Sequence, residues 1–524
     1  MLARILENWL DNVGERGGYE IPFAQALVAR GHRILFRSTH GQLEQGKDII
    51  TIDKAGHYHG YQLKAGDLTL KAWRDIRGEV EELIGLPLQH PDIPAGVAFT
   101  GHLVTSGLLK DPARKTIQDW KETWHQQGHS PLELTDKDAL LRMFLDTHGE
   151  VLLSTPTDLE RFLRLFLADK KDVLAKDDFA AFVESSLPFD TTDLKRSEIK
   201  RALASAAILA SYILQGYQSA KNHHAVAEGW LMVFAYLLAL LEDFPLYLKW
   251  CRPTLDICIS AWETASEDLI REALASPRWV AGDFVPDYAV QGWRTTVVLS
   301  QMCSFALYRR LKGAPLAEEG EILVRVLKDL RHASFWGEGA GPLFYSMVLF
   351  LWLHGQEESA CQWSGQMAKL IADVSGRRQT GPGMLDPYID VRELLGVVHL
   401  GEPPSRDTFR GRSFFLPVLV EFVARRGRKR MLSSIWYDVC EVDRVEFTVD
   451  RKQDFYRWRA KTGSLDTRRW PHPQLWHDLV ATAGADVPKD MLLTRDFLPL
   501  LMPFLTLYPH RFTACMARLV EQSV

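Results

Sequence analysis

The chain has 524 residues, of which 46% are hydrophobic and 25% charged, a composition typical of a globular protein with more than one domain. Its net charge of −5 excludes a general attraction to nucleic acids or anionic membranes, so any site for a polyanion has to be local. The six cysteines form no C-x-x-C pair, which argues against a zinc site or a disulfide framework and favours a reducing, cytoplasmic location.

The first 130 residues or so alternate helix and strand patterns. The opening "MLARILENWLDN" predicts an amphipathic helix rather than a signal peptide, and Pro22 suits the first turn of a second helix that ends at Gly31. After it the patterns predict a strand in "HRILFRS", a hairpin over 46–66, a helix over about 68–84, a strand over 95–107 and a helix in "DPARKTIQDWKETW". This order predicts an α/β domain with a mixed sheet flanked by helices.

From about Thr135 onward the pattern is helical for most of the chain, and it fits either an irregular helical bundle or a solenoid. The segments 197–217 and 223–244 predict an antiparallel helix pair. The most apolar run, Gly229 to Leu241, spans 13 residues, fewer than the roughly 20 needed to cross a bilayer, so we expect a buried helix and no membrane association.

Pro and Gly residues cluster at 401–407, which indicates a boundary within the helical part of the chain. We therefore expect three domains: an α/β domain over residues 1–132, a helical domain over 133–400 and a helical C-terminal domain over 401–524.

The hairpin carries a polar pair on its second strand. Gln62 and Lys64 lie two residues apart and share one face, whereas Tyr61 and Leu63 share the other. Asp48 begins the partner strand. Carboxylate and amide oxygens are ligands that Mg²⁺ prefers, and a lysine on the same face can orient or deprotonate an attacking water. The alternative is an ordinary hairpin with a solvated lysine.

At "GKD" (46–48) and "QLK" (62–64) the sequence resembles the PD-(D/E)XK nucleases, and among them the restriction-endonuclease-like group with Gln-x-Lys that includes type IV restriction enzymes. The resemblance covers about the first 130 residues. It implies a restriction-endonuclease-like fold in which Asp48, Gln62 and Glu20 hold Mg²⁺ or Mn²⁺ and Lys64 positions the water. Gln62 replaces an acid and leaves one charge fewer, which gives Glu20 more weight; Glu15 is a less well placed substitute.

A second signal lies near the other end, where residues 405–470 hold 16 Lys and Arg against 9 Asp and Glu, a local excess of +7. Guanidinium groups are mixed there with aromatic residues, a combination suited to phosphate contacts and base stacking. A solvated basic helix end and a protein-binding or nucleotide-binding patch are the alternatives. The candidate nucleic-acid contacts are Arg425, Arg426, Arg428, Lys429, Arg430, Arg457, Trp458 and Arg459.

The resemblance leads us to expect a Mg²⁺-dependent DNA endonuclease that acts in defence against phage or foreign DNA. The helical region would serve as a sensor, regulatory or assembly module, through a protein partner or a second copy of the chain. The alternative function is a non-catalytic scaffold that binds nucleic acid and protein through a degenerate nuclease domain. An RNase would keep the same residues and change only the substrate.

Overall fold

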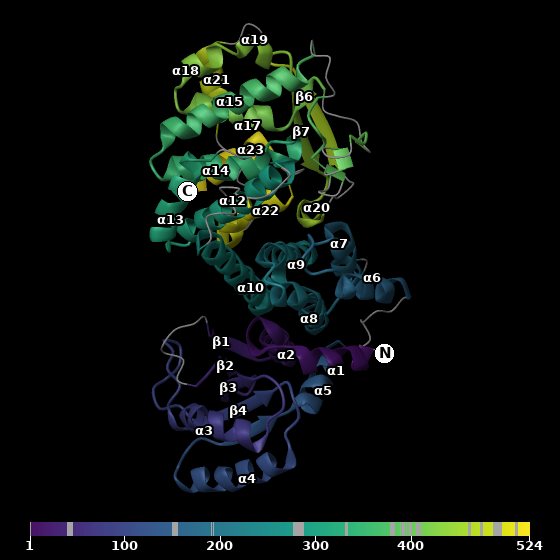
Figure 1. The fold of residues 1–524 in the computed structure, drawn as a ribbon, viewed down its shortest axis with the longest axis vertical. Helices are drawn as coiled ribbons and strands as arrows, with labels where there is room; N and C mark the ends of the chain where they lie inside the picture. Colours follow the sequence, from purple (N-terminus) through teal and green to yellow (C-terminus); the bar gives the residue numbers. More distant parts are fainter. Residues whose placement is uncertain are drawn as a thin grey trace. The chain divides into compact units, whose positions relative to one another are not determined.

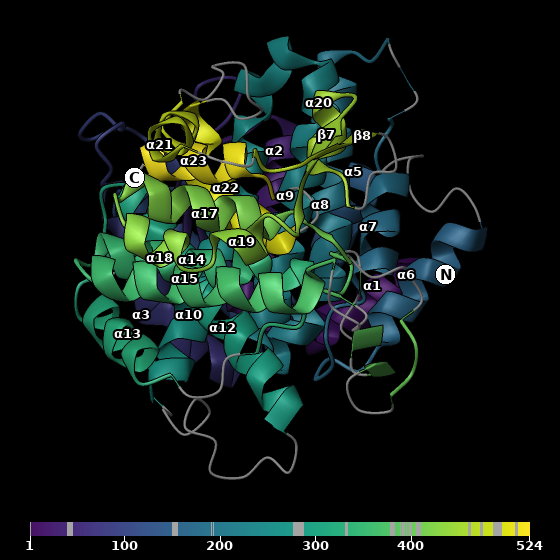
Figure 2. The same cartoon turned by 90° about the horizontal axis from the view of Figure 1, so that it is seen from above.

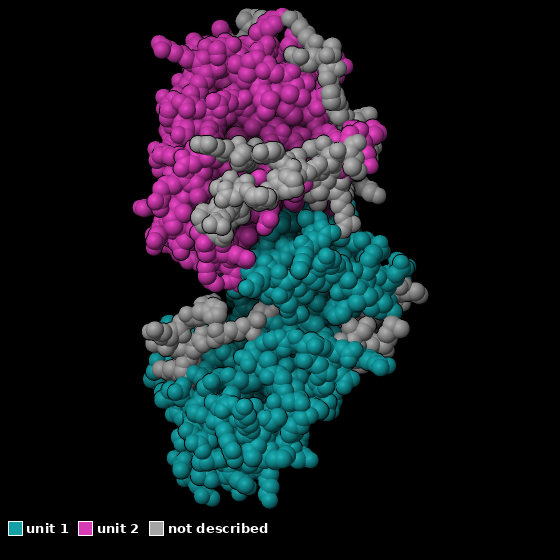
Figure 3. All heavy atoms as spheres, in the orientation of Figure 1, with its two compact units in different colours: residues 1–265 teal, residues 266–524 magenta. Residues whose placement is uncertain are grey.

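The computed structural model describes most of the chain. The described residues are 2–38, 46–148, 156–189, 191, 193–275, 288–330, 334–377, 383–387, 389, 393–394, 396–397, 401–404, 410–458, 463–471, 475–485, 495–508 and 512–523. Two compact units divide the chain, residues 1–265 and residues 266–524, and each is described by itself (Figure 3). The expected three-domain division stays a prediction, and part of its boundary at 401–407 lies outside the described residues.

The first unit contains a mixed sheet flanked by helices, as the sequence predicts, and the sheet has five strands. Its strands follow one another in the order β1-β2-β3-β4-β5, with antiparallel pairing from β1 to β3 and parallel pairing from β3 to β5. The bounds are β1 (Arg33–Arg37), β2 (Ile49–Ile52), β3 (Tyr58–Lys64), β4 (Phe99–Thr105) and β5 (Leu132–Thr135). The strand β5 is absent from the sequence-based expectation.

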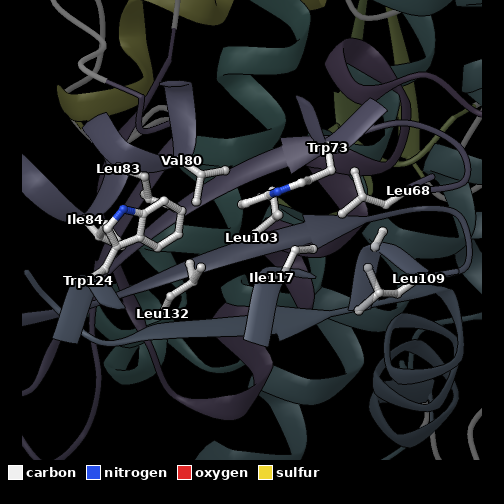
Figure 4. Close-up of a cluster of buried hydrophobic side chains, with 11 residues drawn as sticks. Leu68, Trp73, Val80, Leu83, Ile84, Leu103, Leu109, Ile117, Trp124 and Leu132 are labelled. Atoms are coloured by element: carbon white, nitrogen blue, oxygen red, sulfur yellow. The ribbon is translucent and has the colours of Figure 1, made fainter. Parts of the chain in front are cut away.

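Helices cover both faces of this sheet (Figure 1). On one face α3 (Leu70–Gly85) and α4 (Asp111–Gln126) bury their apolar stripes, and on the other α2 (Glu20–Arg30) packs Phe23 against Tyr61. Thr69 caps α3 by accepting the Ala72 N–H, and α2 ends at Gly31 in the left-handed conformation. The core under α3 and α4 comprises Leu68, Trp73, Val80, Leu83, Ile84, Leu103, Leu109, Ala113, Ile117, Trp124 and Leu132 (Figure 4).

The rest of the first unit is helical. Its remaining elements are α1 (Leu2–Asn12), the short π-helical turn η1 (Glu15–Tyr19), α5 (Lys137–His148), α6 (Pro156–Leu167), α7 (Lys176–Ser185), α8 (Arg196–Ser219), α9 (His223–Asp243), η3 (Pro245–Tyr247) and the first part of α10 (Leu248–Ala275). The expected helix pair is confirmed as α8 and α9, which pack against each other. Among the described residues α9 alone is long and apolar enough to cross a membrane, and it is largely buried inside the protein.

The second unit is mostly helical. Its helices α14 (Gly341–Leu353), α15 (Glu357–Ser375) and α17 (Phe415–Arg425) lie side by side (Figures 1 and 2). A small sheet of three strands, β6 (Arg412–Ser413), β7 (Asp443–Val449) and β8 (Gly463–Arg468), interrupts the helical sequence. The other elements are α12 (Tyr288–Leu311), α13 (Glu318–Lys328), η4 (Glu338–Ala340), α18 (Lys429–Ser433), α19 (Trp436–Val439), α20 (Lys452–Tyr456), α21 (Trp476–Ala483), η6 (Arg495–Leu500), α22 (Leu501–Leu507) and α23 (Ala514–Ser523). All six cysteines of the chain are free thiols.

Candidate functional site

The turn before β2 carries Asp48 to the side of β3. Gly46 has a φ of +72° and lies so close to α3 that a Cβ there would be 2.8 Å from the Glu79 carbonyl oxygen. Only glycine combines this backbone conformation with this approach. The Asp48 carboxylate then accepts the Leu63 N–H at 2.7 Å. Asp48 is thereby fixed between Gln62 and Lys64 along β3.

The Gln62 side chain is buried, with only 5% of the residue exposed. Its Nε2 donates to Glu79 Oε2 at 2.9 Å, whereas its Oε1 is buried and has no hydrogen-bond partner among the described residues. An unpaired buried acceptor costs about 1–3 kcal/mol, so most such atoms in proteins are hydrogen-bonded. This oxygen is suited to a cation that would satisfy it.

Lys64 points to the same face of the sheet as Gln62, as the strand parity predicts. Its Nζ donates to the same Glu79 Oε2 at 2.7 Å, and 18% of the lysine side chain is exposed. Glu79 is not among the site residues that the sequence predicts. The available signal was its place on the predicted helix after the hairpin, one residue before the buried Val80, but pairing a helix residue with a strand requires the packing of α3.

Residues of η1 fix the backbone where β3 ends. The Tyr19 hydroxyl accepts the Lys64 N–H at 2.9 Å, and the Glu15 carboxylate accepts the Ala65 N–H at 2.8 Å. Burial raises the pKa of Tyr19 well above its ordinary value, and the nearby carboxylates of Glu15, Asp48 and Glu20 raise it further. Tyr19 therefore stays neutral, and its surroundings are rich in negative charge.

Glu20 has a partner of opposite charge. Its Oε1 lies 3.6 Å from Arg37 Nε, and both side chains are largely buried. The cross-strand register places Arg37 opposite Ile49 and Ile49 opposite Tyr61, so Arg37 belongs to the strand face that carries Tyr61 rather than Gln62. The guanidinium offsets part of the charge that Glu20 would offer a metal, and the role of Glu20 as a ligand stays a prediction.

Across the residues that the structure describes, no three His, Cys, Asp or Glu side chains cluster closely enough to hold a metal ion. Mg²⁺ does not require such a cluster, since it commonly binds through one or two protein oxygens and completes its shell with water and substrate phosphate. Asp48 and the orphaned Gln62 Oε1 fit that mode, and they are the residues here that could hold Mg²⁺ or Mn²⁺.

The basic segment of the second unit divides into buried and exposed parts. Arg425 and Arg426, at the end of α17, both donate to Glu521 of α23, and their side chains are only 17% and 7% exposed. Arg426 also lies over the Phe422 ring. These two guanidinium groups join parts of the second unit to each other, so little of their charge reaches solvent.

The remaining basic residues are more accessible. Arg428 pairs with Glu357 at 3.0 Å and with Glu358 at 3.3 Å, whereas Lys429 and Arg430 at the start of α18 are exposed. The structure thus leaves α18 as the accessible part of this segment.

The last three predicted contacts lie after β7. Arg457 lies 3.6 Å from Asp454, and the Trp458 ring centroid is 5.5 Å from that of Tyr508. Arg459 lies outside the described residues. The assignment of these residues to nucleic-acid binding stays a prediction.

Comparison with known protein families, with curated proteins and with solved structures finds no match for this chain.

Proposed function

We propose that this chain is a cytoplasmic, Mg²⁺-dependent DNA endonuclease whose hydrolytic site lies at the end of β3. The observation that carries the proposal is the buried Gln62 Oε1, which has no hydrogen-bond partner among the residues described and belongs to the same hairpin as Asp48 and Lys64. By the resemblance of "GKD" and "QLK" to the PD-(D/E)XK nucleases, the biological setting would be defence against phage or foreign DNA.

The chemistry of each residue suggests its role in the proposed reaction. Asp48 and Gln62 would hold the cation, which would offset the charge on the scissile phosphate and acidify a bound water. Lys64 would stabilise phosphate charge or orient the water, because its ammonium group lies on the same strand face as Gln62. Tyr19 and Glu15 would keep this strand end in place through the backbone N–H groups of Lys64 and Ala65.

The test is cleavage of methylated and unmethylated plasmid, linear duplex, single-stranded DNA and RNA, with Mg²⁺, Mn²⁺ or EDTA. We expect metal-dependent cutting that Lys64→Ala reduces by at least about 100-fold, as for loss of a group that acts in the transition state. The preferred substrate decides between a DNase and an RNase. Cutting that survives Lys64→Ala, or that EDTA leaves unchanged, would contradict the proposed site.

A non-catalytic scaffold is the competing function, and the engagement of Lys64 by Glu79 and of Glu20 by Arg37 favours it. Metal binding separates the two proposals. If millimolar Mg²⁺ or Mn²⁺ raises the melting temperature of the wild type but not of Asp48→Ala, the cation site is real, because a ligand stabilises the state that binds it. The same melting temperature with and without metal would favour the scaffold.

A further inference from the structure

A single carboxylate oxygen connects the two polar residues of β3. Glu79 Oε2, on α3, accepts hydrogen bonds from Gln62 Nε2 at 2.9 Å and from Lys64 Nζ at 2.7 Å. The Glu79 side chain is 49% exposed, so it reaches these groups from the rim of the site. Gly46 brings the turn before Asp48 against the backbone of the same residue. Glu79 therefore contacts Gln62 and Lys64 and lies beside the turn that precedes Asp48.

The chemistry of this contact determines which way the Gln62 amide points. An ionised carboxylate accepts hydrogen bonds and cannot donate them, so the NH₂ group of Gln62 has to face Glu79. The carbonyl oxygen Oε1 then points away, and it is this atom that is buried without a hydrogen-bond partner in the described part of the chain. A glutamine at position 79 removes this constraint, because its amide offers a donor as well as an acceptor. The Gln62 amide could then turn over and present NH₂, which no cation accepts as a ligand.

We propose that Glu79 is the positioning residue that makes Gln62 a cation ligand through its carbonyl oxygen. The inference rests on the proposed metal-dependent function and adds the residue that orients one of its metal ligands. Glu79 acts through Gln62 and Lys64 and does not itself need to touch the cation. The ligand atom that it exposes is an oxygen, the type that Mg²⁺ and Mn²⁺ prefer.

The same contact accounts for the glutamine at position 62. A carboxylate at that position would bring two acceptor oxygens to the 2.9 Å that now separates Gln62 Nε2 from Glu79 Oε2, where like charges repel. Gln62 and Glu79 together carry one negative charge and one amide donor. Exchanging the two residues keeps both, so the pair should tolerate exchange better than either single change.

The experiment compares Mn²⁺ affinity across variants of the full chain, measured by the electron paramagnetic resonance of free Mn²⁺ during titration. The variants are Glu79→Gln, Gln62→Glu, the exchange variant Gln62→Glu/Glu79→Gln, Asp48→Ala and Glu81→Gln. Glu81 is the matched control, because it also lies on α3 and pairs with Arg77 at 3.6 Å, away from the hairpin. Circular dichroism checks that each variant is folded.

We expect Glu79→Gln to weaken Mn²⁺ binding roughly 10- to 100-fold, the usual effect of losing a residue that orients a metal ligand. The exchange variant should recover to within a few-fold of the wild type, and Glu81→Gln should bind as the wild type does. Equal affinity in Glu79→Gln and the wild type, or no recovery on exchange, would overturn the role of Glu79 while leaving the metal site intact. Absence of Mn²⁺ binding in the wild type, or unchanged binding in Asp48→Ala, would overturn the metal site and the inference with it.

Discussion

Gly46 determines where Asp48 lies, and it does so through its backbone. Its φ of +72° costs an L-residue about 1 kcal/mol or more, and a Cβ would meet the Glu79 carbonyl oxygen at 2.8 Å and the Leu83 nitrogen at 3.0 Å. Neither backbone atom can move without moving α3. The glycine is therefore required by two separate constraints, one of conformation and one of space.

We expect Gly46→Ala to destabilise the protein by roughly 2–4 kcal/mol and to weaken metal binding, because the turn that carries Asp48 has to shift. Gly56 is the matched control, since its φ is +89° but nothing lies within 4 Å of a Cβ there. Gly56→Ala should cost only about 1 kcal/mol. Urea denaturation measures both changes, and equal losses in the two variants would show that the contact with α3 contributes nothing.

For individual residues, strand parity predicts correctly that Gln62 and Lys64 share a face, because the alternation of side chains follows from backbone geometry alone. The link from Glu79 to both residues does not follow from it, since it depends on how α3 packs on the sheet. The same is true of the pair between Glu20 and Arg37. Which acid meets which base across elements is decided by tertiary packing, and the spacing of residues along the chain does not contain it.

Within the basic segment 425–430 of the second unit, α18 carries the basic side chains that are exposed in the part of the chain that the structure describes. Lys429 and Arg430 are exposed there, whereas Arg425 and Arg426 are committed to Glu521. We expect Lys429→Ala/Arg430→Ala to weaken DNA binding about equally for all sequences. The negative slope of log affinity against log salt should become less steep by about two.

The matched control is Arg310→Ala/Lys312→Ala, which removes two exposed basic residues at the end of α12 in the same unit. Fluorescence anisotropy at several salt concentrations measures both double variants. If the two lower affinity equally, the binding reflects overall charge, and α18 has no special role.

Of the helices in the first unit, the sequence predicts α1 to α4, α8 and α9 individually. It predicts the others only as parts of a generally helical region. The strands β5 and β7 were missed for different reasons. The segment "LELT" of β5 is four residues long, too short for its alternation to be distinguished from a loop. The alternating Val445, Phe447 and Val449 of β7 are a usable strand signal, but they stand in a part of the chain whose overall pattern predicts helices.

On the scale of the whole molecule, an α/β part followed by a mostly helical part is confirmed, because hydrophobic periodicity determines the class of each segment. The division at residue 265 could not be predicted, since helices α5 to α9 look alike in sequence whether they pack with the sheet or with each other. The two units differ in a further property, the pH dependence that their buried titratable groups impose.

The first unit holds a cluster of three histidines, in which His59 Nδ1 lies 3.0 Å from His102 Nε2. Burial, reinforced by the charge of His59, lowers the pKa of His102 to about 3 and that of His32 to about 4. The carboxylate nearest to His102, that of Glu133, is 66% exposed and offsets this only weakly. In the unfolded chain these histidines bind protons near pH 6.5, whereas in the folded protein they stay neutral until a lower pH. The free energy of unfolding that is present above pH 6.5 is therefore lost as the pH falls toward 4.

The second unit contains a buried acid, Glu338, whose effect on stability changes with pH in the opposite direction. Glu338 accepts the N–H groups of Phe414 and Phe415 at the start of α17, and burial raises its pKa to about 7. Its folded pKa lies above the ordinary 4.5, so the stability that it contributes is complete below pH 4.5 and is lost as the pH rises to 7. Between pH 4.5 and 6.5 the two units should therefore respond to pH with opposite signs.

Native-state hydrogen exchange, corrected for the pH dependence of intrinsic exchange and followed peptide by peptide, measures the opening free energy of each unit separately. From pH 6.5 to 4.5 we expect protection to fall in the core of the first unit, by an amount on the order of 2 kcal/mol, and to rise in α14 and α17. His102→Gln should flatten the first slope and Glu338→Gln the second, whereas His125→Gln, at an exposed position on α4, should change neither. Slopes of the same sign in both units, unaffected by these variants, would mean that other groups dominate, because the two buried groups titrate in opposite directions relative to the unfolded chain.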